Sequence, residues 1–125
     1  MATVEATAAT FDELVDEPGI VLVDFWAEWC GPCRAFGPVF EAASAVHTDI
    51  SFAKVDTEAE RELAARASIT SIPTLMAFKG GTLVFSQPGA LPATALEQLI
   101  AAVRDLDVEQ VRAPQGADDR PGTGA

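Results

Sequence analysis

The sequence has few basic residues, and this shortage excludes several classes of function. Only eight of the 125 residues are Lys or Arg, against nineteen Asp or Glu, so the formal net charge is −11. Nucleic acids and anionic membrane surfaces are bound through clustered Lys and Arg, so we expect neither as a partner. We expect the acidity to favour solubility or partners with a positively charged surface.

Long apolar runs and a secretion signal are also missing. No apolar run approaches the ~20 residues that a membrane-spanning helix needs. The start of the chain, MATVEATAATFDELV, lacks the basic residues followed by an apolar stretch that mark a signal peptide. We therefore expect a cytoplasmic, reducing environment, in which a pair of cysteines serves chemistry more often than structure.

What the sequence does contain is an alternation of strand and helix patterns. Strands are predicted at residues 3–7, 20–26, 50–56, 74–78 and 82–86, and helices at 11–15, 32–46, 58–67 and 92–106. This order predicts an α/β fold with a central mixed sheet of about five strands, flanked on both faces by about four helices.

The length fits one domain, which we place at residues 1–107. Residues 108–125 are rich in Gly, Pro and Asp and show no apolar periodicity. Such a segment cannot bury enough apolar surface to offset its ordering entropy, so a disordered tail is predicted there.

The only two cysteines, Cys30 and Cys33, lie in the stretch WCGPC. A structural disulfide between them would close a very short loop and contribute little stability. A metal site needs three or four ligands, and the one other soft ligand is His47, which we expect to be a solvated residue near a helix end. We expect no metal, and the third interpretation, a redox couple, is favoured.

The position of the pair supports the redox interpretation. A strand is predicted just before Cys30 and a helix just after it. Unpaired N–H groups and the positive end of the helix dipole would then stabilise a thiolate on the first sulfur. Cys33 would lie one turn further, within reach for a disulfide.

Asp24 is a carboxylate within the apolar strand that leads to the cysteines. Burial without a full partner would raise its pKa, which suits a general base near neutral pH. The alternative is a partly exposed aspartate at the end of the strand.

Several separate motifs together resemble the thioredoxin family. They are LVDFWAEWCGPC, Lys54, SIPT at 71–74, FKGG at 78–81 and GAL at 89–91, and the resemblance extends from Val4 to Leu106. It implies a thioredoxin fold and a protein-disulfide reductase.

The resemblance assigns roles to the active-site residues. Cys30 becomes an exposed nucleophile that attacks a substrate disulfide, and Cys33 a less exposed thiol that resolves the mixed disulfide. The spacer Gly31-Pro32 implies a mainly reductive direction. Asp24 is implied to assist deprotonation of Cys33, with Lys54 beside it.

The resemblance also implies a substrate-binding surface around the cysteines. Pro73 would follow a cis peptide bond and leave the backbone of Ile72 free to pair with an extended substrate. Trp29 would contribute an exposed apolar surface, with Gly89 and Ala90 opposite. Trp26 is expected to pack beneath the active-site loop, and Pro88 stands where the family usually has a residue with a backbone N–H.

No bound cofactor is implied; a separate thioredoxin reductase would supply electrons from NADPH to a monomer acting on protein disulfides. Two alternatives remain. One is a binding or chaperone-like module with secondary redox activity, and the other is a dedicated oxidase or isomerase with a more oxidising couple.

Overall fold

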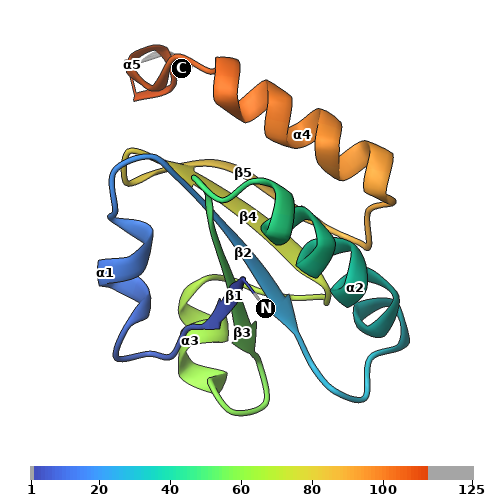
Figure 1. Ribbon diagram of the computed structural model, residues 1–125. Helices are drawn as coiled ribbons and strands as arrows, with labels where there is room; N and C mark the ends of the chain where they lie inside the picture. The colour runs from blue at the N-terminus through green and yellow to red at the C-terminus, as the bar shows by residue number, and fades with distance from the viewer. Residues whose placement is uncertain (1, 113–125) are drawn as a thin grey trace, which may run out of the picture.

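The computed structural model describes residues 2–112, which form a five-stranded mixed sheet with helices on both faces (Figure 1). The strands are β1 (Thr3–Glu5), β2 (Ile20–Trp26), β3 (Ser51–Asp56), β4 (Thr74–Lys79) and β5 (Thr82–Pro88). The helices are α1 (Phe11–Val15), α2 (Gly31–Val46), α3 (Arg61–Arg66), α4 (Ala93–Asp105) and α5 (Val108–Arg112). The predicted α/β fold with a mixed central sheet is confirmed.

The sheet has the strand order β1-β3-β2-β4-β5. Strands β1 and β2 run parallel to β3, whereas β4 is antiparallel to β2 and to β5. The near-continuous apolar run of β2 follows from its central place, because a strand covered on both faces exposes no side to water. The β4–β5 turn is made by Gly80 and Gly81, both with positive φ, as the sequence predicts.

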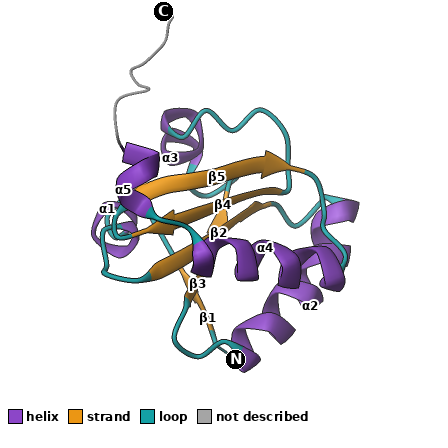
Figure 2. Cartoon of the chain, turned by 90° about the horizontal axis from the view of Figure 1, so that it is seen from above, coloured by secondary structure: helices purple, strands orange, loops and turns teal. Residues whose placement is uncertain are grey.

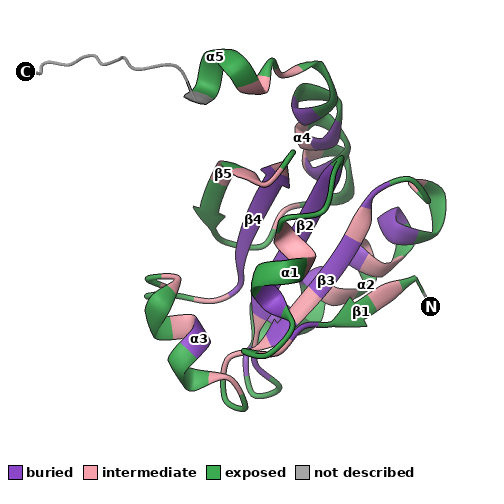
Figure 3. Ribbon diagram, turned by 90° about the vertical axis from the view of Figure 1, so that its left-hand side faces the viewer, coloured by how far each residue is buried: buried purple, intermediate pink, exposed green. Residues whose placement is uncertain are grey.

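The two faces of the sheet are covered by different helices (Figure 1). Leu22 of β2 packs in a cluster with Phe36 and Phe40 of α2 and with the buried residues of α4. Val23 of β2 belongs to the opposite cluster, to which α1 and α3 contribute. Figure 3 shows buried residues along the central strands and on the sides of the helices that face them.

Strand β1 ends two residues before its predicted end and β5 two residues after it, and two further predictions were wrong at the ends of elements. Helix α3 begins at Arg61 and not at 58, because the side chain of Asp56 accepts the backbone N–H groups of Glu58 and Ala59 and holds a turn there.

The second error concerns the predicted tail. Residues 108–112 form α5, a fifth helix, and Asp107 accepts the N–H of Glu109 at its start, as an N-terminal cap does. Helix α5 follows α4 and contacts β5 (Figure 2). The rest of the predicted tail, 113–125, lies outside the described residues.

Candidate active site

The two cysteines lie at the N-terminus of α2 and form a disulfide, with their Cα atoms 5.2 Å apart. Cys30 is the N-cap residue, and its Sγ accepts the backbone N–H of Cys33 at 3.2 Å. Gly31 and Pro32 occupy the first helical positions and are exposed. This is the predicted position, in which a helix N-terminus stabilises negative charge on the first sulfur.

The two cysteines do not differ in exposure as expected. Cys30 is 4% exposed and Cys33 3%, because both pack with Ala27 against Trp26 and Ile72. The prediction of an exposed Cys30 was therefore wrong for this disulfide form. The two sulfurs differ in their place on the helix. The Cys30 sulfur accepts a hydrogen bond from a backbone N–H of the first turn of α2, whereas Cys33 is itself a residue of that turn.

The loop that leads into β4 completes the site. The Ile72–Pro73 peptide bond is cis, as the resemblance implies, and Cys30 Sγ lies 3.7 Å from the carbonyl oxygen of Ile72. The ladder of β4 begins only at Thr74, so Ile72 lies just outside the sheet.

A second loop lies against Pro73. The N–H of Gly89 donates to the Pro73 carbonyl at 2.8 Å, and Gly89 has a φ of 108°, which favours glycine. Ala90 follows and is exposed. Pro88 pairs opposite Thr74 at the end of the edge strand β5, where a missing N–H is tolerated. The structure thus brings Cys30, Ile72, Pro73 and Gly89 together.

Trp29 is 66% exposed and projects beside the disulfide-bearing helix end. Its Nε1 donates to Glu58 at 3.2 Å, and the Glu58 carboxylate also accepts from Arg61 at 2.8 Å. The indole borders a hollow of about 350 Å³, which is lined by Trp29, Thr57, Ala64, Ile69, Thr70, Ser71 and Ile72. Sequence reasoning missed Glu58, because only folding brings it to a residue 29 positions earlier.

Asp24 is fully buried below the active-site loop. Among the described residues, neither of its carboxylate oxygens has a hydrogen-bond partner. Burial raises the pKa of Asp24 to about 7, and the positive charge of Lys54, its register partner on β3, acts in the opposite direction. The expected direction is confirmed, and the alternative of a partly exposed aspartate is wrong.

Trp26 lies near both the cysteine pair and the pair formed by Asp24 and Lys54. It is half-buried and packs against the cluster of Ala27, Cys30 and Cys33, which agrees with its predicted place under the active-site loop. The Lys54 Nζ atom is 4.8 Å from the centroid of its ring, a distance typical of a cation–π contact.

His47 is not the solvated residue that the sequence predicted. It ends α2, and its Nε2 lies 2.9 Å from Glu97 of α4 while its Nδ1 lies 3.1 Å from the Arg104 guanidinium. Arg104 also donates to Asp49 and lowers the Asp49 pKa to about 2. These polar contacts tie the C-terminal end of α2 to α4, away from the cysteines.

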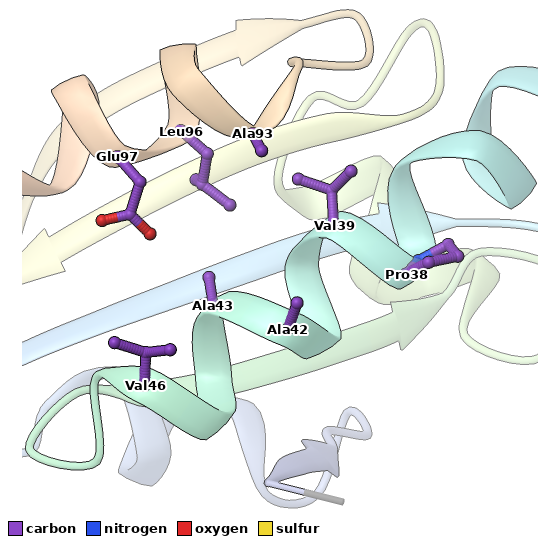
Figure 4. Close-up of a pocket in the computed structure, with 8 residues that line it drawn as sticks. All are labelled: Pro38, Val39, Ala42, Ala43, Val46, Ala93, Leu96 and Glu97. Atoms are coloured by element: carbon purple, nitrogen blue, oxygen red, sulfur yellow. The ribbon is translucent and has the colours of Figure 1, made fainter.

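An apolar groove of about 360 Å³ runs between α2 and α4 (Figure 4), and is lined by Pro38, Val39, Ala42, Ala43, Val46, Ala93, Leu96 and Glu97. It contains no titratable group besides Glu97 and no cysteine. Within residues 2–112, no three His, Cys, Asp or Glu side chains gather as a metal site would require. No helix in this described range has the length and apolarity to cross a membrane.

Known proteins are similar to this chain in sequence and in fold. The Thioredoxin family model matches residues 2–102. A Streptomyces coelicolor protein provisionally named thioredoxin 2 is 53% identical over 111 residues, covering 89% of this chain and 83% of that protein. Thioredoxin 1 of a Nostoc species is 46% identical, covering 79% of this chain and 94% of that protein.

A comparison with solved structures points to the same family. The structure of Plasmodium falciparum thioredoxin superposes with a TM-score of 0.73 at 38% identity, covering 80% of this chain and 97% of that one. The chain therefore belongs to the thioredoxin family of dithiol–disulfide oxidoreductases.

Proposed function

We propose that this protein works mainly as a reductase of disulfide bonds in other proteins. The observation that carries the proposal is the place of the Cys30 sulfur, which accepts an N–H group of α2 and lies beside the Ile72 carbonyl. A thiolate formed there is stabilised by the helix end and faces a backbone segment that is free to dock a substrate. The Gly31-Pro32 spacer supports the reductive direction through the family resemblance.

The reaction starts from the reduced dithiol. The Cys30 thiolate attacks one substrate sulfur, forms a mixed disulfide and releases the other substrate sulfur as a thiolate, which takes up a proton. Cys33 then loses its proton and attacks Cys30, which closes the Cys30–Cys33 disulfide and releases the second substrate thiolate. Two electrons thus pass from the dithiol to the substrate, and the second released thiolate also takes up a proton, so that both substrate sulfurs end as thiols.

Asp24 is the proposed acceptor of the Cys33 proton. It lies on the sheet face that α2 covers, two residues before Trp26, which packs against the cluster that contains both cysteines. With its pKa raised to about 7 by burial, it exchanges a proton readily near neutral pH. Lys54 supplies the one opposing charge that acts on Asp24 among the described residues.

The substrate segment is proposed to bind across the surface formed by Trp29, Ile72, Pro73, Gly89 and Ala90. An extended chain can pair with the backbone at Ile72, since the β4 ladder starts two residues later. The exposed Trp29 ring and the hollow beside it offer apolar contact for a substrate side chain.

The thioredoxin family carries out this exchange without a bound cofactor, so the electrons must come from a partner. We infer that NADPH supplies them through a separate thioredoxin reductase, and that the protein acts as a cytoplasmic monomer with its activity in residues 1–107. A reducing compartment would keep the dithiol available between turnovers.

The test is reduction of insulin disulfides with dithiothreitol, comparing the wild type with Cys30→Ser and Cys33→Ser. The wild type should accelerate insulin precipitation, and neither variant should. Equal rates for all three would favour the alternative of a binding or chaperone-like module. A coupled assay with NADPH and thioredoxin reductase then tests the electron donor.

The direction of the reaction needs a separate measurement. Equilibration against glutathione buffers should give a reduction potential in the range of reducing dithiols. A couple that stays reduced in mildly oxidising glutathione would instead identify an oxidase or isomerase.

A further inference from the structure

The ammonium of Lys54 is not held by the carboxylate that it acts on. Lys54 and Asp24 are register partners on β3 and β2, so their side chains lie on the same face of the sheet. Yet among the described residues neither Asp24 oxygen has a hydrogen-bond partner, and no ion pair within 4.0 Å joins the two. Some other group must therefore fix where this charge lies.

That group is the indole of Trp26. Side chains alternate along β2, so Trp26 shares the face of Asp24, and its ring centroid is 4.8 Å from Lys54 Nζ. Gly37 of α2 approaches the ammonium from the helix above, because a Cβ at this position would lie 4.0 Å from Nζ, an ordinary contact distance. Trp26 thus packs against the cysteine cluster and also contacts the lysine that acts on the buried carboxylate.

Few other charges face the side chains of Asp24, Trp26 and Lys54. Asp56 is the register partner of Trp26, but its Oδ1 accepts the N–H groups of Glu58 and Ala59. On the other side of β2, the register partner of Asp24 is the apolar Leu75 of β4. After burial itself, the charge of Lys54 is therefore the second influence on the Asp24 carboxyl.

We propose that Trp26 is a positioning residue, whose ring holds the Lys54 ammonium facing Asp24 and thereby sets how readily Asp24 exchanges a proton during resolution of the mixed disulfide. Without the ring, the half-buried lysine turns toward water and its charge is screened. The inference rests on the proposed role of Asp24, but the coupling of the three side chains can be measured without turnover.

The experiment is an NMR titration of the Asp24 carboxyl carbon in the oxidised protein. Replacement of Trp26 by Phe keeps a weaker aromatic face, and replacement by Leu removes it. The midpoint of Asp24 should move upward from about 7, slightly for Trp26→Phe and by roughly half to one pH unit for Trp26→Leu. Trp29→Leu, which removes the exposed tryptophan of the same loop, should leave the midpoint unchanged.

A double-mutant cycle separates this effect from a general loosening of the site. In a Lys54→Met background the Trp26 substitutions should cause no further upward shift, because the charge that they displace is absent. Water entering the smaller side chain's space would lower the midpoint in both backgrounds and cancels in the difference. An equal shift in both backgrounds, or none in either, overturns the proposal.

Two further measurements keep the outcomes distinct. If Trp26→Leu fails to fold, the Trp26→Phe and Lys54→Met cycle still gives the coupling. The pH midpoint of mixed-disulfide resolution should follow the NMR midpoint across the variants, and a resolution rate independent of the Asp24 midpoint contradicts the positioning role. If Asp24→Asn resolves at the wild-type rate, the base assignment fails while the measured coupling stands.

Discussion

Two neighbouring residues of β2, Asp24 and Phe25, belong to opposite faces of the same sheet. Phe25 lies on the face covered by α1 and α3, in a cluster made of apolar residues throughout, with its ring 6.1 Å from that of Phe11. Asp24 lies on the face covered by α2, where Lys54 and Trp26 follow the apolar core residues toward the cysteines.

The difference shows how one strand serves stability and chemistry together. Side chains alternate across a strand, so each face can have its own composition without changing the backbone. The α1/α3 face buries a cluster of apolar side chains beside the uncharged hydroxyl of Thr74, the register partner of Phe25. The α2/α4 face combines its own apolar cluster with a carboxylate of raised pKa near the redox pair, at a cost in stability.

The largest expected effect comes from breaking the apolar face. Phe25→Ala should lower the free energy of unfolding by about 3–5 kcal/mol, because it leaves a cavity in a fully buried cluster. Urea denaturation measures the loss, and thiol exchange in the fraction that remains folded should be unchanged. Leu83→Ala, at a 45% exposed position, serves as the control and should stay within about 0.5 kcal/mol.

Replacing Asp24, in contrast, is expected to raise the free energy of unfolding at neutral and higher pH. Its native pKa of about 7 lies above the ordinary 3.8, so the native state holds a proton that the unfolded state has already released between these pH values. Wild-type stability should therefore fall as the pH rises from about 4 to about 7 and be level above that. The full loss is about 4 kcal/mol, at roughly 1.4 kcal/mol per pKa unit.

Asp24→Asn removes that titration. The variant should be more stable than the wild type at pH 8, by up to about 4 kcal/mol, and nearly equal to it at pH 4. Its resolution of the mixed disulfide at pH 7 should be slower by roughly tenfold or more. Urea denaturation at both pH values and quenched-flow kinetics test this, and a stability difference independent of pH would contradict it.

A smaller effect is expected at the edge of the site. Trp29→Ala removes an exposed ring, so the fold should keep its stability while KM for a protein substrate rises roughly tenfold. Steady-state reduction of insulin measures this change. A fall in kcat with KM unchanged would show that Trp29 does not act in docking.

The smallest effect tests the link between Trp29 and Glu58. Glu58→Gln keeps an acceptor for the indole N–H but removes the charge that binds Arg61, so KM should change by less than about twofold. The same assay at low and high salt checks this result. A change as large as that of Trp29→Ala would mean that the Glu58 charge itself binds substrate.

Much of this architecture could be predicted from local patterns. The apolar run of β2, the Gly80-Gly81 turn and the position of Cys30 before a helix all follow from short-range rules of periodicity and capping. Sequence reasoning missed the start of α3 because it depends on the Asp56 side chain, which accepts two backbone N–H groups. It missed α5 because that helix begins at the Asp107 side chain, which accepts one. The Asp107 cap is a signal that the sequence does carry.

What the sequence could not supply is the register between strands and the contacts of distant segments. Trp26 and Lys54 meet only because β2 and β3 pair in one particular register. Glu58 reaches Trp29, and His47 reaches Glu97 and Arg104, across turns and helices that no local pattern specifies. The nearly equal burial of the two cysteines likewise depends on side chains from the Ile72 loop.

The central claim is the division of work between Cys30 and Cys33, and trapping of the mixed disulfide tests it most directly. Reduced Cys33→Ser and Cys30→Ser are each mixed with a disulfide substrate, quenched with acid and analysed by intact-mass spectrometry. The account predicts a long-lived adduct that forms rapidly on Cys33→Ser and much more slowly on Cys30→Ser. Faster adduct formation on Cys30→Ser, or equal rates for both variants, would contradict it.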